Sequence, residues 1–432
     1  MEGIKHPILQ VALDFVDLPR ALKLAEESVS GGADWLEAGT PLIKSEGLHC
    51  IRELRSKFPS VKIIADMKTM DAGRAEVEIA AKAGANIITV LASAHDETIK
   101  ECVDAASNYG AEILADLLEV EDAVKRAKEV EKIGVNYIGL HIPIDEQMTG
   151  NISFDVLKKV SSAVALPVAI AGGINSENAA EALNAGAEII IVGGAITKSE
   201  NAKTETQKIK RAIKEKIKIK TQLYKRVTEK NVIDVLQMVS TANISDAMHR
   251  GMHLRGLTPI TPGKKMIGRA VTVRTYPGDW AKPVEAIDIA KEGDVLVIDA
   301  GGVEPAVWGE LATNSALQKA LSGVVIDGAI RDVAEIRSLG FPAFARIITP
   351  QAGEPKGFGE INIPVIISGV RIFPGDWLVG DDDGVISIPR EKIAEITNRS
   401  MDVLEKENRI RKEINEGGTL AKVTQLLKWE KK

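Results

Sequence analysis

Cysteine and aromatic residues are scarce in this sequence of 432 residues. The two cysteines, Cys50 and Cys102, lie far apart, and neither has a histidine at metal-ligand spacing. This excludes a disulfide framework, gives no sign of a zinc site and fits a reducing cytoplasm. Aromatic residues make up 4% of the chain, too few for stacking platforms along single-stranded nucleic acid. We therefore expect a cytoplasmic protein without a nucleic-acid partner.

Long apolar runs and a strong excess of positive charge are also missing. No run reaches the roughly 18 apolar residues of a membrane span, and the start of the chain lacks the apolar core of a signal peptide. The net charge is −6 with 27% charged residues, so the overall surface is not basic. The sequence predicts a soluble protein without a membrane partner.

The length of the chain suggests two or three domains, and one segment is typical of a junction between them. Residues 201–230 contain neither proline nor glycine and hold a run of lysines with few acidic residues. Such a run is either a solvated helix or a contact for RNA or an acidic partner, and we favour the helix. We predict a first domain over 1–210, a basic helical linker over 211–230 and a second domain over 231–432.

Before the junction, short apolar runs of high strand propensity alternate with Ala-, Glu- and Lys-rich stretches of helical periodicity. The eight runs are Ile8 to Leu13, Trp35 to Glu37, Val61 to Ala65, Asn86 to Val90, Glu112 to Ala115, Asn136 to Leu140, Pro167 to Ala171 and Glu188 to Val192. Eight such units predict an α/β fold, the closed (β/α)₈ TIM barrel, whose functional groups follow the carboxyl ends of the strands. The alternative, a doubly wound open sheet, would not place polar residues at nearly every strand end.

The most informative stretch follows the third run and reads Asp66-Met67-Lys68-Thr69-Met70-Asp71. On an extended backbone Asp66 and Lys68 point to the same side, and Asp71 follows on the loop. Such a triplet holds a divalent metal, stabilises an enediolate or forms a surface ion pair. Polar residues at other strand ends favour the active site, and they are Asp14, Glu37, Asp116 and His141.

Two glycine pairs follow the last two runs, Gly172-Gly173 and Gly193-Gly194. The loops at those places of a barrel often hold a phosphate on backbone N–H groups, and glycine permits the close approach. One pair alone is typical of any turn. Two pairs in the expected places predict a phosphorylated substrate.

With these motifs the N-terminal half resembles the orotidine 5′-monophosphate decarboxylase superfamily, which carries Asp-x-Lys-x-x-Asp after the third strand. Within it the chain is most similar to the 3-hexulose-6-phosphate synthases. The matching stretches are Leu13-Asp14, Glu37 to Pro41, Asp66 to Asp71, His141 with Asp145, and Val192 to Thr197. The resemblance implies a lyase that reversibly condenses formaldehyde with ribulose 5-phosphate, with Mg²⁺ or Mn²⁺ as cofactor. The direction of flux stays open.

The resemblance also implies roles for single residues. Glu37 and Asp66 would hold the metal, and Lys68 would face the oxyanion of an enediolate. His141 is the candidate proton shuttle, because a near-neutral pKa suits transfer in both directions. Asp71 would reach across a dimer interface. The implied catalytic set is Asp14, Lys68, Asp71 and His141.

Two positions after His141 depart from related families. The synthases usually have a glycine two residues after the histidine, where Pro143 stands here. The 3-keto-L-gulonate 6-phosphate decarboxylases have an arginine three residues after it, where Ile144 stands. Since isoleucine cannot replace a guanidinium, the decarboxylase is the alternative for the barrel rather than the first choice.

From Asn231 onward, strand-like runs punctuated by glycine and aspartate predict an α/β domain that ends in a charged helix from Arg390. This half resembles the family that joins the regulator of ribonuclease E activity A (RraA) with 4-hydroxy-4-methyl-2-oxoglutarate aldolases, of the swivelling β/β/α type. The matching stretches are Ile244 to Ala247, Asp299 to Gly302, Trp308 to Thr313, Asp327 to Asp332 and Gly380 to Val385.

That second resemblance implies a second site. Asp332 would order a divalent metal, Arg331 would bind the carboxylate of a 2-oxo acid, and Glu310 and the Leu311 backbone would line the pocket. Because the family also contains members that act only by binding proteins, two roles stay open: a 2-oxo acid aldolase or oxaloacetate decarboxylase, and a regulator of a ribonuclease partner. The family forms trimers, so a dimeric barrel fused to it would close as a hexamer.

Overall fold

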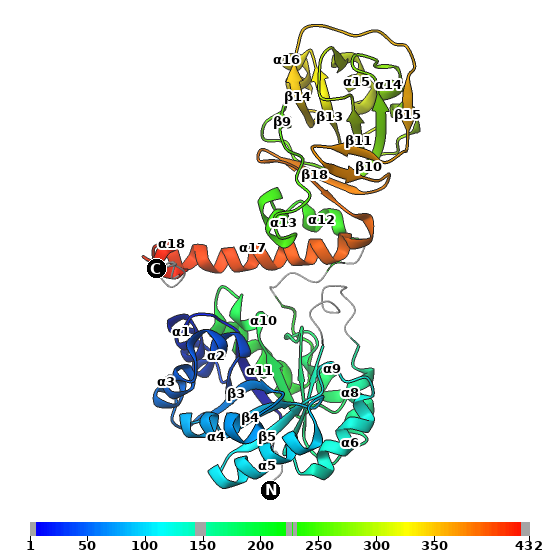
Figure 1. The fold of residues 1–432 in the computed structure, drawn as a ribbon. Coiled ribbons are helices and arrows are strands. Elements are labelled where there is room, and N and C mark those ends of the chain that lie inside the picture. Colours follow the sequence, from blue (N-terminus) through cyan, green and yellow to red (C-terminus); the bar gives the residue numbers. More distant parts are fainter. Residues whose placement is uncertain (1–5, 143–152, 222–226, 228–230, 425–432) are drawn as a thin grey trace. The chain divides into compact units, whose positions relative to one another are not determined.

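The computed structural model describes residues 6–142, 153–221, 227 and 231–424. Two compact units divide these residues (Figure 1). Unit 1 takes the described residues up to 221 and again from Glu405 on, and unit 2 takes residue 227 and those from 231 to Leu404. The chain therefore returns to its first unit near the C-terminal end.

Unit 1 contains a closed barrel of eight parallel strands. In chain order they are β1 (Ile8–Leu13), β2 (Trp35–Ala38), β3 (Lys62–Thr69), β4 (Ile87–Leu91), β5 (Glu112–Asp116), β6 (Tyr137–His141), β7 (Val168–Ala171) and β8 (Ile189–Val192). Each strand pairs with the next, and β8 pairs with β1. This confirms the predicted barrel. The doubly wound sheet is wrong, because it would leave β1 and β8 without the hydrogen bonds that join them.

Helices cover the outside of the barrel (Figure 1). They are α1 (Leu18–Ser30), α2 (Thr40–Glu46), α3 (His49–Lys57), α4 (Gly73–Ala83), α5 (Asp96–Tyr109), α6 (Ala123–Ile133), α8 (Asp155–Ser161), α9 (Ala179–Asn184), α10 (Gly194–Thr197) and α11 (Ala202–Glu215). Local side chains explain several ends. The Asp17 carboxylate accepts the Arg20 N–H and begins α1, and Gly84, with a φ of 109°, ends α4.

Strand side chains alternate between the helix layer and the barrel interior. Leu9, Val11 and Leu13 of β1 face the helices in the main core. A separate apolar cluster fills the barrel interior, and its buried members are Ile8, Trp35, Ile64, Ile87, Leu114, Tyr137, Ala169 and Ile189. This cluster packs the interior of the barrel, and the polar groups lie beyond it, at the carboxyl ends of the strands.

Unit 2 is built on a mixed sheet with the order β19-β18-β10-β11-β13-β14-β9, with β12 beside β13, β15 beside β10 and a separate β16–β17 hairpin. The strands are β9 (Thr258–Pro259), β10 (Met266–Thr275), β11 (Val295–Asp299), β12 (Ala306–Trp308), β13 (Gly323–Ile330), β14 (Ala343–Ile348), β15 (Gly359–Ile361), β16 (Val365–Ile367), β17 (Val370–Ile372), β18 (Trp377–Asp381) and β19 (Gly384–Ile388). The predicted α/β class of this half is confirmed.

Three apolar clusters hold unit 2 together. Helices α14 (Ala281–Ile289), α15 (Glu310–Gln318) and α16 (Val333–Leu339) share one cluster with one face of the sheet, and the β16–β17 hairpin shares another with the opposite face. The third joins β18 and β19 to α12 (Val232–Leu236), α13 (Thr241–Ala247) and the start of α17 (Ile393–Asn415). Helix α17 is the predicted charged helix, and it follows the short 3₁₀ helix η1 (Arg390–Lys392).

The predicted helical linker over 211–230 is wrong in its described middle part. Helix α11 ends at Glu215, and residues 217–221 have no regular secondary structure. Lys216 takes a left-handed φ of 53°. The Ile219 N–H then donates to the Ser176 carbonyl oxygen at 2.9 Å, a bond within the barrel unit that replaces a helical one. Residues 222–226 and 228–230 lie outside the described residues.

The end of α17 belongs to unit 1, which differs from the predicted second domain over 231–432. Arg409 is 5% exposed and pairs with Glu27 of α1 at 3.1 Å. It also donates to the carbonyl oxygens of Ser199 and Glu200 at 3.2 and 3.3 Å. The short helix α18 (Leu420–Val423) follows in the same unit. No sequence pattern predicted this return, because it depends on contacts between distant residues.

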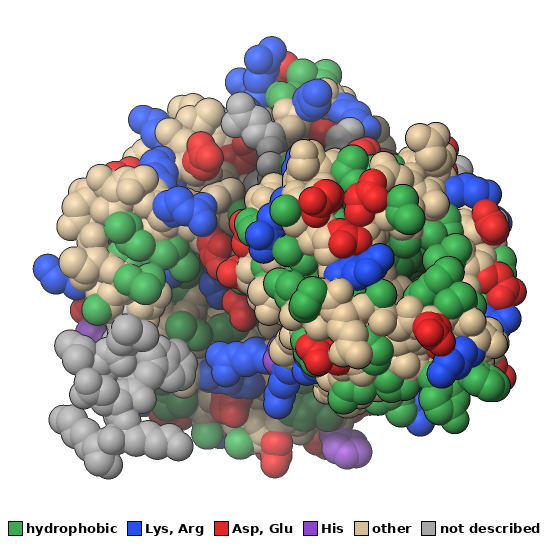
Figure 2. Space-filling model, turned by 90° about the horizontal axis from the view of Figure 1, so that it is seen from above, with side chains coloured by type: hydrophobic (Ala, Val, Ile, Leu, Met, Phe, Trp, Pro, Cys, Tyr) green, Lys and Arg blue, Asp and Glu red, His purple; other side chains and the backbone are tan. Residues whose placement is uncertain are grey.

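None of the helices in the described part of the chain combines the length and apolar character needed to cross a membrane. Figure 2 shows acidic and basic side chains interspersed over the face in view. That mixture agrees with the modest net charge of −6.

Candidate functional site

The mouth of the barrel gathers charged side chains from five strands. Glu37, Asp66 with Lys68, Asp116 and His141 lie at or near the carboxyl ends of β2, β3, β5 and β6, and Asp14 follows β1. Because all eight strands are parallel, these ends open at one side of the barrel. Asp66 and Asp116 are 6% and 7% exposed, so this is a partly dehydrated cluster and not a surface ion pair.

Lys68 is held between two aspartates. Its Nζ lies 3.1 and 3.0 Å from the two carboxylate oxygens of Asp66 and 3.3 Å from Asp116 Oδ2. Burial alone would lower the Lys68 pKa, but the two carboxylates outweigh it and raise the pKa above its ordinary value. The ammonium therefore stays charged and ready to face a negative oxygen.

A distortion of β3 aims these groups. The register between β3 and β4 shifts between Ala65 and Thr69, and Lys68 has a left-handed φ of 48°. Thr89 of β4 bridges the distorted part of β3. Its Oγ1 accepts the Lys68 N–H at 3.1 Å and donates to Asp66 Oδ1 at 2.8 Å. Strained backbone of this kind costs about 1–3 kcal/mol and is typical of functional sites.

Two further carboxylates, Glu37 and Asp14, lie close to Asp66. Glu37 is 8% exposed, and its pKa is raised well above the ordinary value, first by burial and then by Asp66 and Asp14. Asp14 lies at the exposed rim, and its pKa is also raised, by desolvation and then by Asp66. With Asp116 the mouth holds four carboxylates against one lysine, an excess of negative charge that a cation would offset.

The residues present fit a magnesium site. No group of three or more His, Cys, Asp or Glu side chains forms a ready-made metal cage within the described residues. Mg²⁺, however, usually keeps several water ligands and binds proteins through one or two carboxylates. Glu37 and Asp66 supply that number of carboxylates at the buried edge of the mouth.

His141 is the last residue of β6 and is partly buried at the mouth of the barrel. Burial lowers its pKa, and the carboxylate of Asp116 opposes this only in part. The neutral imidazole therefore dominates at pH 7 and can accept a proton. Pro143, Ile144 and Asp145, which the sequence comparison singled out, lie outside the described residues.

Asp71 does not join the cluster in its own barrel. It is exposed, and its Oδ1 accepts the N–H of Ala72 at 2.7 Å. The neighbouring Met70 is 52% exposed. The last member of the Asp66 to Asp71 stretch thus points to the outside, unlike the first two charged residues.

The glycine pairs follow β7 and β8 as their spacing predicts. Gly172 and Gly173 have φ values of 100° and 68°, which favour glycine. A Cβ on Gly193 would lie 3.4 Å from Asp14 Oδ2, so this glycine borders the charged cluster. Gly194 is exposed, and a Cβ there would lie 3.6 Å from the Nζ of Lys198.

Sequence patterns missed four residues that shape the site: Gln10, Gly39, Thr40 and Thr89. Thr40 Oγ1 lies 2.7 Å from Asp66 Oδ2. A Cβ on Gly39 would lie only 2.1 Å from Asp14 Oδ1, so this glycine makes room for the carboxylate. The motif match covered Gly39 and Thr40 without giving them a role, and no signal marked Gln10 or Thr89.

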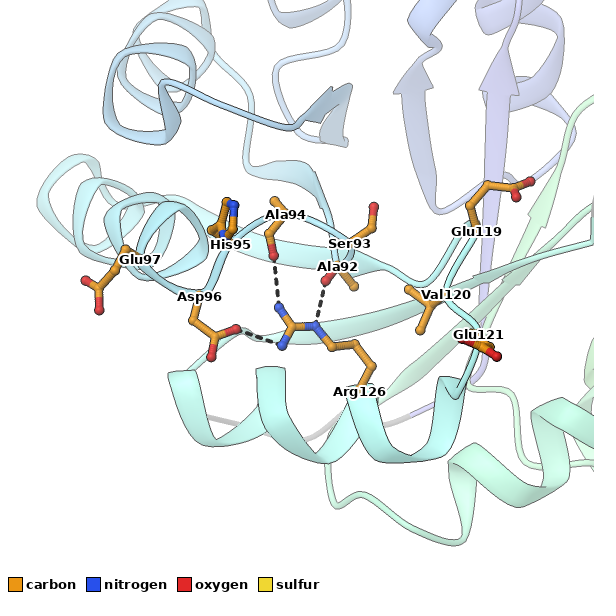
Figure 3. A pocket seen from close by; sticks show the side chains of 10 residues that line it. All are labelled: Ala92, Ser93, Ala94, His95, Asp96, Glu97, Glu119, Val120, Glu121 and Arg126. Atoms are coloured by element: carbon orange, nitrogen blue, oxygen red, sulfur yellow. Dashed lines mark hydrogen bonds and ion pairs between the residues drawn. The ribbon is translucent and has the colours of Figure 1, made fainter.

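A separate hollow of about 730 Å³ lies beyond the ends of β4 and β5 (Figure 3). Arg126 of α6 reaches into its wall and donates to the carbonyl oxygens of Ala92 and Ala94 at 2.6 and 3.0 Å. It also forms ion pairs with Asp96 at 2.7 Å and Glu129 at 3.0 Å. Because the guanidinium already has these partners, we infer that Arg126 holds the loop after β4 in place and does not bind an anion.

In unit 2 the predicted pocket residues also come together. Asp332 Oδ2 accepts the Glu310 N–H at 3.1 Å and lies 3.4 Å from Arg331 Nε. A Cβ on Gly309 would lie 2.5 Å from that same oxygen. Leu311 is 77% exposed. The pair is much more open to water than the barrel cluster.

Two family models match the chain. Residues 7–209 match the orotidine 5′-phosphate decarboxylase / HUMPS family, and residues 241–387 match the RraA-like family, described as Aldolase/RraA. These matches confirm both resemblances that the motifs indicated.

The barrel is similar to curated 3-hexulose-6-phosphate synthases. It is 40% identical over 206 residues to that of Bacillus subtilis (strain 168), which covers 48% of this chain and 98% of the relative. It is 44% identical over 190 residues to that of Methylomonas aminofaciens, covering 44% and 90%. A solved 3-hexulose-6-phosphate synthase is 37% identical, with a TM-score of 0.46, and covers 48% of this chain and 99% of its own.

Proposed function

The chain belongs to the orotidine 5′-phosphate decarboxylase / HUMPS family through residues 7–209, and on this premise we propose that its barrel reversibly condenses formaldehyde with D-ribulose 5-phosphate. The product is D-arabino-hex-3-ulose 6-phosphate, and the enzyme is a lyase like its curated relatives. The observation that carries the proposal is Lys68 held between Asp66 and Asp116 beside the buried Glu37.

The reaction needs a carbon nucleophile. Loss of a proton from C1 of ribulose 5-phosphate leaves an enediolate, whose C1 attacks the carbon of formaldehyde and forms the new C–C bond. The neutral His141 accepts the C1 proton and returns it to the oxygen of the former formaldehyde. Lys68 faces the enediolate oxygen, where a fixed positive charge stabilises the developing negative one. The reverse sequence releases formaldehyde.

Glu37 and Asp66 would hold the cofactor. Mg²⁺ or Mn²⁺ bound there supplies a Lewis acid beside the enediolate oxygens. The excess of carboxylates in the mouth supports this assignment, since Asp66 and Asp14 both raise the pKa of Glu37. The phosphate of the substrate would lie on the backbone of Gly172, Gly173, Gly193 and Gly194.

The decisive test is formaldehyde-dependent consumption of ribulose 5-phosphate, with and without a chelator. Asp66→Ala and Lys68→Ala should strongly reduce the activity, and the chelator should suppress it in the unaltered protein. Lys62→Ala is the matched control, because Lys62 lies at the other end of β3 and pairs with Glu112. Unchanged rates in Lys68→Ala would contradict the proposal.

For unit 2 we propose a metal-dependent 2-oxo acid lyase site at Arg331 and Asp332. The support is geometric: the Glu310 N–H fixes one oxygen of Asp332, and the side chain of Arg331 beside it is 41% exposed. Oxaloacetate should release pyruvate in the presence of Mg²⁺, and Arg331→Ala should stop this. If the unaltered protein shows no turnover and captures a ribonuclease, the regulatory role is correct instead.

We also propose that the protein assembles through both units, the barrel as a dimer and unit 2 as a trimer. Exposure of Asp71 and Met70 supports a role for this loop in a neighbouring barrel. Light scattering should give the mass of a hexamer, and a mass equal to one dimer would exclude the trimeric contact.

A further inference from the structure

Gln10 is a polar residue deep inside the barrel. It lies in the middle of β1, points to the interior and is 1% exposed. Its chain neighbours Leu9 and Val11 face the helices instead. Burying an amide costs free energy unless both its ends form hydrogen bonds, so the contacts of each end are informative.

The nitrogen end of the amide is bonded to Glu37. Gln10 Nε2 donates to Glu37 Oε2 at 2.5 Å, and both side chains are buried. The two residues lie on neighbouring strands, where Ala12 is the direct partner of Glu37, so the bond runs diagonally across the strand pair. A hydrogen bond to a carboxylate is stronger than one between neutral groups. It holds Glu37 in one orientation.

The oxygen end has no partner within the described part of the barrel. Gln10 Oε1 is buried and accepts no hydrogen bond there. For the ionised Glu37 that a metal ligand requires, turning the amide around would not help, because Oε1 would then meet a carboxylate oxygen, and both are acceptors. An unmet buried acceptor costs about 1–3 kcal/mol, which a single donor such as a water molecule removes.

We propose that Gln10 is a positioning residue of the metal site. Its N–H fixes the Glu37 carboxylate for a divalent cation, and its Oε1 accepts a hydrogen bond from a water molecule buried beside it. The inference rests on the proposed function, in which Glu37 is a metal ligand. Partners that orient a metal ligand typically change metal affinity by about 10- to 100-fold.

The test is Mn²⁺ binding without sugar phosphate, followed by the electron paramagnetic resonance signal of free Mn²⁺. Gln10→Met keeps the length of the side chain and removes both hydrogen bonds, and Gln10→Glu replaces the donor with an acceptor. Both should bind Mn²⁺ about 10- to 100-fold more weakly. The KM for the metal should rise more than kcat falls at saturating metal, which a purely structural role would not produce.

Ser28→Ala is the matched control. Ser28 on α1 is also fully buried with an unpartnered hydroxyl in the described structure, but it lies in the helix layer, away from the mouth. Its loss should leave Mn²⁺ affinity unchanged.

The outcomes separate this inference from the proposed function. Unchanged Mn²⁺ affinity in Gln10→Met and Gln10→Glu, with weak binding in Glu37→Gln, overturns only the role of Gln10. Normal binding in Glu37→Gln contradicts the metal site itself. If neither Gln10 variant folds, a high-resolution crystal structure of the unaltered protein decides, because no water within about 3.2 Å of Gln10 Oε1 would overturn the proposal.

Discussion

The barrel and unit 2 each place a basic side chain beside an aspartate, but the surroundings of the two pairs differ. In the barrel the side chains of Asp66 and Asp116 are both 9% exposed. In unit 2 the side chains of Arg331 and Asp332 are 41% and 36% exposed. A closed sheet gathers groups from several strands and removes water, whereas a turn after one strand leaves its pair in solvent. Charges therefore interact strongly in the barrel and weakly in unit 2.

The largest effect should come from removing one charge in each unit. Lys68→Ala should lower kcat for formaldehyde condensation about 100- to 1000-fold, because the enediolate oxygen loses its fixed positive charge. Oxaloacetate turnover should stay unchanged in that variant, and Arg331→Ala should show the reverse pattern. Both assays run on the same preparations. Loss of both activities in Lys68→Ala would mean that the two sites do not act separately.

A smaller and directly comparable effect should follow from adding one methyl group beside each aspartate. In Gly39→Ala the new Cβ would lie 2.1 Å from Asp14 Oδ1, and in Gly309→Ala 2.5 Å from Asp332 Oδ2. We expect about a 100-fold loss in the barrel, since a shift of about 1 Å can cost that much. The loss in unit 2 should be smaller, because a displaced Asp14 also disturbs Asp66 and Lys68, whose charges act on it, whereas a displaced Asp332 disturbs its pair with Arg331. Equal losses in the two assays would contradict this difference in charge coupling.

The stability of unit 2 should depend on a buried carboxylate outside its site. Asp279 is 2% exposed and accepts four backbone N–H groups, from Ala281, Lys356, Gly357 and Phe358. Asp279→Asn should lower the free energy of unfolding by about 2 kcal/mol, measured in denaturant by tryptophan fluorescence. Asp288→Asn is the control, because that side chain is 83% exposed.

The pH dependence of that loss has a definite sign. Burial alone would raise the pKa of Asp279, but the hydrogen bonds from the backbone N–H groups outweigh burial and lower this pKa in the folded protein. The ionised Asp279 therefore stabilises the folded protein fully above the pKa of the unfolded state, about 3.9. This stabilisation is lost as the pH falls through the lower pKa of the folded state. The difference between Asp279→Asn and the unaltered protein should shrink below about pH 4. A constant difference from pH 7 to pH 3 would contradict the assignment.

Thiol labelling tells whether the barrel unfolds with unit 2. Cys50 and Cys102 are both buried in the barrel, and burial raises their pKa to about 11 and about 12. They should therefore react only when the barrel opens. In Asp279→Asn, labelling should keep the midpoint of the unaltered protein while the fluorescence midpoint falls. Parallel shifts would show that the units unfold together.

The smallest effect should come from Thr89. Thr89→Val removes the hydroxyl that links the Lys68 backbone to Asp66, so both groups lose orientation but stay in place. We expect a fall in kcat of about 10-fold, the lower end for partners that orient a site. Thr69→Val is the control on β3, because its hydroxyl contacts Glu76 instead. A similar fall in Thr69→Val would point to loosening of the strand and not to loss of the Thr89 contact.

Local sequence patterns predicted most of the barrel but only part of its site. Seven of the eight strands begin and end within one residue of an apolar run, whereas β3 continues four residues beyond Ala65. The charged residues at strand ends were recognisable from position alone. Thr89 was not, because a threonine inside a strand is ordinary, and its bond to Asp66 spans 23 residues of chain. The helical linker was mispredicted for a related reason. A run without glycine or proline favours a helix, but the Ile219 bond to Ser176 holds the backbone elsewhere.

The sequence by itself determined the order of strands and helices and which strand ends carry charge, because side-chain alternation and turn residues act over a few positions. It also determined the two family matches, at 7–209 and 241–387. The pairing of β8 with β1 decided between the predicted closed barrel and the open sheet. Only the tertiary structure decided that Gln10 meets Glu37 and that the chain returns to unit 1 from Glu405. These depend on barrel closure and strand register, which arise from packing between distant residues.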